Sequence, residues 1–145
     1  MDTVEQLAPM LSAQQWATLR VLVDLIIPAD DVPGGWEAGV GEYLRRQFQG
    51  ALQPALPLYR DGLDALEREA HTRGGDSFAM LDSGAQEALL HQIEVGEVLV
   101  EWSVSAAGFF AMVVEHVMEG FYSDPANGGN RGAVAWNMIG FEVHG

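Results

Sequence analysis

Residues 103–122 read SVSAAGFFAMVVEHVMEGFY and form the most apolar long segment of the chain. Their apolar side chains recur at helical spacing and occupy more than one stripe of the predicted helix. They are Val104, Phe109, Phe110, Met112, Val113, Val114, Val117, Met118 and Phe121. A helix that is apolar over most of its circumference packs against neighbours on several sides. We therefore expect this segment to be the central helix of the core.

A long amphipathic helix is predicted ahead of it, over residues 54–73. Pro54 and Pro57 suit a first helical turn, where the missing N–H costs nothing. An apolar stripe with steps of three and four follows, made of Leu56, Tyr59, Leu63, Leu66 and Ala70. The opposite face is charged and carries Arg60, Asp61, Asp64, Glu67 and Arg68. This pattern is typical of a helix with one face in the core and one in solvent.

Helix-start signals mark two shorter helices. Ser12-x-x-Gln15 is a capping box, in which each side chain binds a free backbone N–H of the first turn. Pro28 cannot continue the helical ladder, so this first helix is expected to end near residue 27. Ser83-x-x-Gln86 is a second possible capping box and predicts another helix start.

A further helix is predicted over residues 36–49, and no convincing alternating pattern of a strand competes with the helices. The sequence therefore predicts an all-α fold. We expect a single compact helical domain of about five to six helices around a central apolar C-terminal helix. The domain is expected to span residues 1–145, with residues 1–10 as a flexible N-terminal segment.

The composition excludes several classes of function. The chain has 145 residues, of which 21 are acidic and 7 are basic, so the formal net charge is −14. It contains neither Lys nor Cys. Binding of nucleic acids needs clustered cations and is disfavoured, and thiol chemistry, disulfides and Cys-based metal sites are impossible. The negative charge indicates a solubility feature, or a face matched to a partner rich in Arg or Lys.

The sequence shows no signal for membrane insertion or export. No window approaches the ~18 apolar residues of a transmembrane helix, so we expect no direct membrane insertion. The acidic start of the chain lacks the basic region of a secretory signal, and Arg45-Arg46 lies too deep for a twin-Arg signal. The default expectation is a cytoplasmic chain. The alternatives are a periplasmic chain whose leader was removed, or export together with a partner.

The segment after the central helix is unusual. Residues 123–132 read SDPANGGNRG, and their Pro, Asn and Gly residues favour special backbone angles. Arg131 is the only basic residue after residue 73. We expect it to organise the loop by pairing with Asp124, to reach a partner, or both. The candidate partner-binding or loop-organising residues are Asp124, Pro125, Gly128, Gly129, Asn130, Arg131 and Trp136.

Two blocks of the chain carry a family pattern. The first reads Ile26-Ile27-Pro28-Ala29-Asp30-Asp31-x-Pro33-Gly34. The second reads Glu115-His116-x-x-Glu119-Gly120-Phe121-Tyr122-Ser123-Asp124-Pro125, followed by Gly128-Gly129-Asn130-Arg131-Gly132 and Trp136-x-x-Ile139-Gly140. Together they resemble the gluconate 2-dehydrogenase subunit 3 family, over roughly residues 10–142.

This resemblance implies a small accessory subunit of a flavin-dependent sugar or polyol dehydrogenase. In such complexes a large catalytic subunit holds FAD, and a cytochrome c subunit often passes the electrons onward. The small subunit has no cofactor of its own and is implicated in maturation, stability and export of the large subunit. The chain departs from the family pattern because the twin-Arg leader is absent, which fits a trimmed form or a cytoplasmic variant of the complex.

A different class of function is a free-standing helical metal-binding protein or enzyme centred on Glu115, His116 and Glu119. On a helix, His116 and Glu119 can share one face, and with Asp124 they could bind a divalent cation or serve acid–base chemistry. Metal sites usually need three or four convergent ligands, and few are local here. The sequence favours a hydrogen-bonded structural histidine, and it offers no nucleotide-binding loop and no serine-nucleophile motif.

Overall fold

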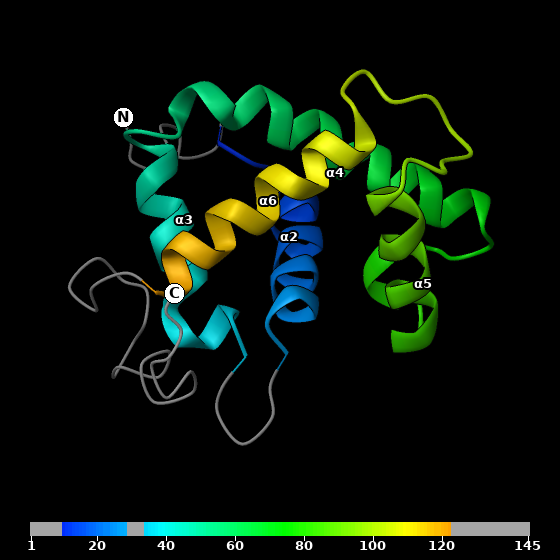
Figure 1. Ribbon diagram of the computed structural model, residues 1–145, viewed down its shortest axis with the longest axis horizontal. Helices are drawn as coiled ribbons and strands as arrows, with labels where there is room; N and C mark the ends of the chain where they lie inside the picture. Colours follow the sequence, from blue (N-terminus) through cyan, green and yellow to red (C-terminus); the bar gives the residue numbers. More distant parts are fainter. Residues whose placement is uncertain (1–9, 29–33, 123–145) are drawn as a thin grey trace.

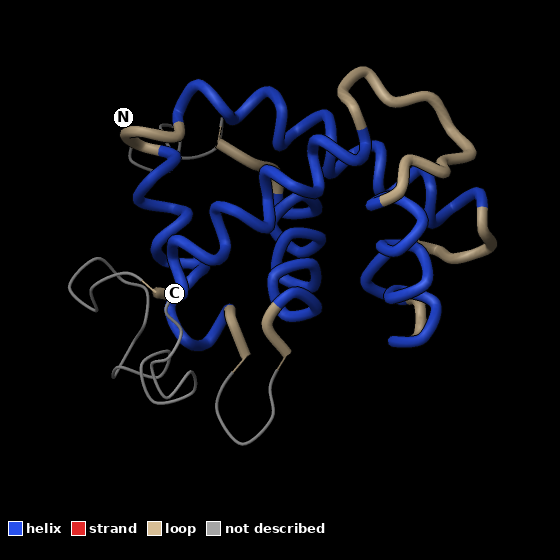
Figure 2. Tube along the Cα trace, viewed as in Figure 1, coloured by secondary structure: helices blue, strands red, loops and turns tan. Residues whose placement is uncertain are grey.

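Five α-helices dominate the computed structural model, which describes residues 10–28 and 34–122 (Figures 1 and 2). They are α2 (Ala13–Ile26), α3 (Gly41–Phe48), α4 (Leu56–Thr72), α5 (Ser83–Glu94) and α6 (Ala106–Phe121). Shorter turns precede three of them, namely the π-helical turn η1 (Trp36–Val40) and the 3-10 turns η2 (Gln53–Ala55) and η3 (Phe78–Met80). No strand occurs in the described ranges, and the predicted all-α fold is confirmed.

The apolar helix α6 lies at the centre, as predicted. It contacts α2, η1, α3, α4 and α5, and Figure 1 shows it crossing α2 between α3 and α5. Phe109, Val113 and Val117 are among its buried side chains. One strip of the helix nevertheless faces solvent, because Glu115 and Glu119 stand one turn apart and both are exposed. Its apolar circumference is therefore covered on several sides but not on all.

Of the two predicted capping boxes, one is present in the structure and the other is not. At α2 the capping box is complete, since Gln15 N donates to Ser12 Oγ and Ser12 N donates to Gln15 Oε1. At α5 the prediction was wrong by one residue. Asp82, not Ser83, takes the extended N-cap conformation, and its carboxylate accepts from Ala85 N at 2.8 Å. A carboxylate is at least as good a cap as a hydroxyl, and its charge also suits the helix N-terminus.

The helix predicted over residues 36–49 is interrupted. Gly39, inside η1, has φ 113°, a left-handed conformation that favours glycine, and it kinks the chain just before α3. Gly41 then allows the Trp36 ring to lie against the start of α3, because a Cβ there would come within 2.6 Å of the ring. Asp24 of α2 fixes the same corner by accepting a hydrogen bond from Trp36 N at 2.9 Å.

The apolar stripe of α4 is buried as predicted, and Tyr59 is fully inaccessible to solvent. Its predicted charged face is only partly in solvent. Asp64 accepts a hydrogen bond from Gln15 Nε2 at 3.0 Å, and Glu67 accepts one from the Thr18 hydroxyl at 2.6 Å. These two carboxylates therefore join α4 to α2.

Candidate functional site

The sequence-predicted site residues lie outside the described part of the chain. These are Asp124, Pro125, Gly128, Gly129, Asn130, Arg131 and Trp136, while the predicted flexible segment 1–10 is described only at Met10. The three residues of the alternative site, Glu115, His116 and Glu119, are described on α6. The surroundings of these three residues can therefore be described, whereas those of Asp124, the further ligand of that alternative, cannot.

His116 is bound to a buried tyrosine. The Tyr59 hydroxyl lies 2.8 Å from His116 Nδ1 and donates to it when that nitrogen is unprotonated, and the two rings stack with centroids 5.8 Å apart. Burial lowers the pKa of His116, against the opposing charges of Glu119 and Glu115. Burial also raises the pKa of Tyr59, and the Glu119 carboxylate raises it further. The pair is thus neutral near pH 7 and links α4 to α6.

The described residues alone do not form the metal site of the alternative, whose further candidate ligand Asp124 lies outside them. Within residues 10–28 and 34–122, no group of three or more His, Asp or Glu side chains converges as metal ligands do. His116 uses Nδ1 for Tyr59, while Glu115 and Glu119 are exposed. These contacts favour the structural histidine.

The lowered pKa of His116 predicts a pH dependence of stability. His116 is harder to protonate in the folded protein than in the unfolded chain. The stability that neutral His116 contributes is therefore fully present above its ordinary pKa of 6.5, and it is lost as the pH falls from 6.5 through the lower folded-state pKa. In His116→Gln, the free energy of unfolding is expected to fall less between about pH 7 and pH 5 than in the unchanged protein. Urea unfolding at each pH measures this, with the exposed His71→Gln as control. Parallel curves for His116→Gln and the unchanged protein would contradict it.

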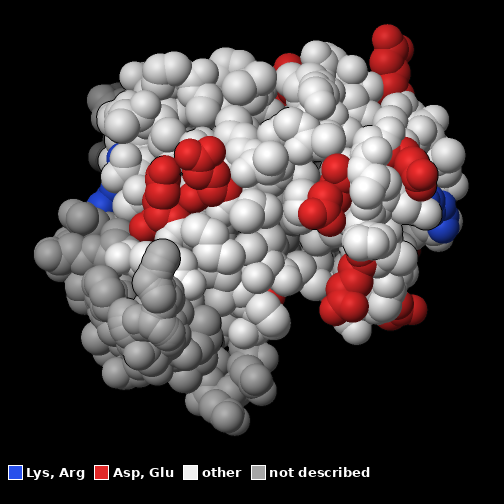
Figure 3. All heavy atoms as spheres, viewed as in Figure 1, with Lys and Arg blue, Asp and Glu red and all other residues white. Residues whose placement is uncertain are grey.

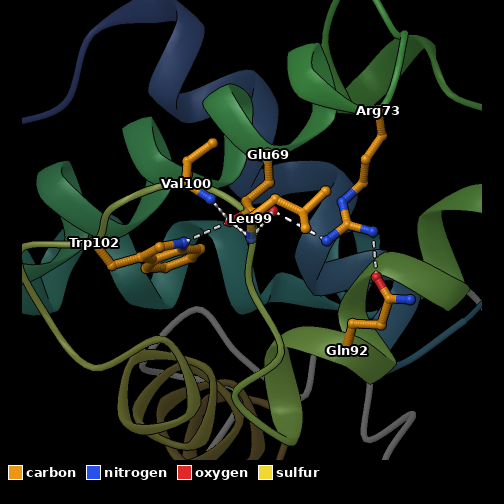
Figure 4. Close-up of polar contacts among 6 residues, drawn as sticks. All are labelled: Glu69, Arg73, Gln92, Leu99, Val100 and Trp102. Atoms are coloured by element: carbon orange, nitrogen blue, oxygen red, sulfur yellow. Dashed lines mark hydrogen bonds and ion pairs between the residues drawn. The ribbon is translucent and has the colours of Figure 1, made fainter.

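The largest polar network of the described residues is centred on Glu69, in the second half of α4 (Figure 4). Its carboxylate is fully buried and accepts hydrogen bonds from Leu99 N and Val100 N, both at 2.9 Å, and from Trp102 Nε1 at 3.0 Å. These three donors belong to residues 95–105, the loop between α5 and α6, here called the 95–105 loop. One carboxylate thus holds the middle of the largest described loop, drawn in tan in Figure 2.

Arg73 completes this network one turn further along α4. Its Nη2 lies 3.1 Å from Glu69 Oε1, and its Nη1 donates to Gln92 Oε1 of α5. Burial would raise the pKa of Glu69, but the hydrogen bonds from Val100, Trp102, Arg73 and Leu99 together lower it below its ordinary value. Glu69 is therefore ionised near pH 7, with its oxygens occupied by donors of the chain itself. Such a carboxylate positions a loop and has no free lone pair for acid–base chemistry.

Sequence reasoning did not single out Glu69, although a signal existed. Glu69 follows the buried Leu66 by three residues and precedes the buried Ala70, so it falls on the apolar stripe of α4. An acidic residue at such a position is rarely buried without partners. The signal does not identify those partners, because they come from a loop about thirty residues further along the chain.

Two recesses in the described surface have aromatic side chains in their lining. The larger, of about 380 Å³, is open and is lined by Trp16, Trp36, Glu37, Gly41, Glu42 and Arg45. Its Arg45 Nη2 already pairs with Glu42 Oε2 at 2.7 Å. The smaller, of about 140 Å³, is mostly apolar and is lined by Leu58, Val104, Ser105, Gly108, Phe109 and Met112. Neither brings together a nucleophile and a base.

The described residues also include the five α-helices. No helix among them has both the length and the apolar character needed to cross a bilayer.

Comparison with known proteins places this architecture in a family. Residues 13–143 match the family described as gluconate 2-dehydrogenase subunit 3, so the resemblance seen in the two sequence blocks is confirmed. No curated protein and no solved structure matches the chain. The family name denotes a subunit of a gluconate dehydrogenase complex, which implies partner subunits. Because the match covers nearly the whole sequence, the chain belongs to the gluconate 2-dehydrogenase subunit 3 family.

Proposed function

We propose that this chain is the non-catalytic small subunit of an FAD-dependent sugar or polyol dehydrogenase. It binds the catalytic flavoprotein subunit and stabilises or matures it. FAD is bound by that partner and not by this chain. A cytochrome c subunit is a candidate second partner. The observation that carries the proposal is the family match over residues 13–143.

The described structure supports an accessory role through what its buried polar groups do. Glu69 and Gln86 are buried and bind backbone groups of neighbouring segments, while Thr18 binds a carboxylate on α4. The Tyr59–His116 pair joins two helices. These groups stabilise the helical body, which leaves the surface to interact with other subunits.

Co-expression with the flavoprotein subunit tests the proposal. The flavoprotein is expected to co-purify with this chain, and its soluble yield and FAD content are expected to fall when this chain is omitted. Haem absorbance in the natively purified complex would reveal a cytochrome c subunit. A flavoprotein that is equally soluble, FAD-loaded and active alone, and that never co-purifies, would overturn the proposal.

Arg131 is the residue of the predicted Asp124–Trp136 segment whose substitution we expect to matter most. Arg131→Ala removes the only cation after residue 73 and, with it, any pairing to Asp124 or to a partner carboxylate. The yield of soluble, FAD-loaded dehydrogenase on co-expression is therefore expected to fall. Arg45→Ala is the matched control, because it removes a partly exposed cation from a surface ion pair that contributes little. Unchanged yield and FAD content in Arg131→Ala would remove this segment from the proposal.

A further inference from the structure

One surface combines exposed apolar side chains with carboxylates. It consists of Glu94, Val95, Glu97, Leu99 and Glu101, here called the 94–101 surface. Val95 is 61% exposed and Leu99 is 65% exposed, whereas the apolar residues on either side of Leu99 are half-buried. The three glutamates are exposed as well. Two large apolar side chains exposed within five residues of each other, among three glutamates, make this segment a candidate contact surface.

The backbone beneath this surface is held from both ends. The buried Glu69 carboxylate binds the amides of Leu99 and Val100, and Arg68 Nη2 donates to the Glu101 carbonyl at 2.9 Å. At the α5 end, Glu97 N donates to the Gln92 carbonyl at 2.8 Å. The exposed leucine is therefore presented by an ordered backbone and not by a free loop. Such preorganisation lowers the entropic cost of binding a partner.

Charge decides which partner fits. The surface carries three carboxylates, whereas the nearby cations are Arg68 and Arg73, and the Arg73 guanidinium is already paired with Glu69. Figure 3 shows acidic side chains over α5 and the 95–105 loop, with Arg atoms only at the edges of the view. A second copy of this chain would bring the same carboxylates together, and nucleic acids or anionic lipids would be repelled. The complementary partner has an apolar centre rimmed by Arg or Lys.

We propose that the 94–101 surface docks onto a basic-rimmed apolar face of the flavoprotein subunit, with Leu99 as its apolar anchor and Glu97 and Glu101 as its charged rim. This rests on the proposed function, because that function supplies the partner. The role assigned to Glu69 is to position the surface; it does not touch the partner itself.

The apolar arm of the test uses the purified chain and the purified flavoprotein subunit. Leu99→Ser is expected to raise the dissociation constant of the complex about tenfold or more, as loss of a central apolar anchor does. Met80→Ser is the matched control, since Met80 is 73% exposed but lies in η3, at the other end of α5. It is expected to leave affinity unchanged. Both side chains are exposed, so both variants are expected to keep the melting temperature of the unchanged chain.

A second set of variants tests the glutamates of the surface separately from Leu99. In Glu97→Gln/Glu101→Gln the association rate is expected to fall and to depend less on ionic strength, because rim charges steer encounter more than they hold the complex. The control pair Asp76→Asn/Glu87→Gln removes the same charge from exposed positions outside the surface. Its association rate is expected to stay closer to that of the unchanged chain.

The outcomes distinguish the two proposals. If the unchanged chain binds the flavoprotein and Leu99→Ser binds equally well, docking occurs elsewhere and this inference is wrong. If the unchanged chain does not bind the flavoprotein at all, the proposed function fails and takes this inference with it. The inference would also be wrong if the chain associated with itself and Leu99→Ser abolished that association, because the surface would then join two copies.

Discussion

Glu69→Ala is expected to lower the free energy of unfolding by about 3–5 kcal/mol, which is the range for removing one partner of a buried charge pair. The substitution removes the fully buried carboxylate that accepts from the Leu99 and Val100 amides and from the Trp102 indole N–H. It also leaves Arg73 without its carboxylate. The cost comes from these stranded donors more than from the lost side chain.

Graded variants identify the cause. Glu69→Gln keeps the shape and one acceptor oxygen, so its loss is expected to be smaller than that of Glu69→Ala. Glu87→Ala is the control, because Glu87 is exposed on α5, and its effect is expected within about 0.5 kcal/mol. Urea unfolding followed by tryptophan fluorescence measures all three. A loss for Glu69→Ala as small as that for Glu87→Ala would contradict the role assigned to the network.

The network also predicts an acid limit of stability. The pKa of Glu69 is lower in the folded protein than its ordinary value of 4.5, so its contribution is present above that value and is lost as the pH falls through the folded-state pKa. His116 acts at higher pH, because its contribution declines below 6.5. The free energy of unfolding is therefore expected to fall in two separate pH ranges, below 6.5 and below 4.5. Substitution of His116 is expected to reduce the first fall, and substitution of Glu69 the second.

Local signals in the sequence were enough to predict the helices. The capping box at Ser12, the stripe of α4 and the apolar character of α6 depend on residues within a few positions of one another. The break at Gly39 was not predicted, because a single glycine within a helical pattern is usually tolerated. The structure shows what accompanies the break, since two residues later the Trp36 ring lies against Gly41.

The site was harder to predict because it is made of distant contacts. Glu69 meets Leu99, Val100 and Trp102 only after α5 has turned the chain back. His116 was singled out for its neighbours on α6, yet its decisive contact is Tyr59, which is 57 residues away. Helical periodicity reports which face of a helix is buried, but it does not report which side chain covers that face.

Gly62 is a close-contact point between α4 and α6. A Cβ built on Gly62 would overlap the ring carbons Cδ1 and Cε1 of Phe109. That ring has little room to move, since it is 5% exposed and its centroid lies 6.1 Å from that of Tyr59 and 6.0 Å from that of Trp102. Any side chain at this position must therefore push the two helices apart or force the ring from its rotamer.

Gly62→Ala is accordingly expected to lower the free energy of unfolding by about 1–3 kcal/mol, although alanine gains up to about 1 kcal/mol in helix propensity. Gly84→Ala is the matched control in α5, because its Cβ would meet only Asp82 Oδ1 at 3.5 Å, an ordinary contact. It is expected to be neutral or stabilising. Phe109→Leu shrinks the obstructing ring, so adding Gly62→Ala to it is expected to cost less than adding it to the unchanged chain. If Gly62→Ala were as stable as Gly84→Ala, the contact between Gly62 and Phe109 would not fix the spacing of α4 and α6. The N-terminal half of α6 would then have to be held in place by the 95–105 loop instead.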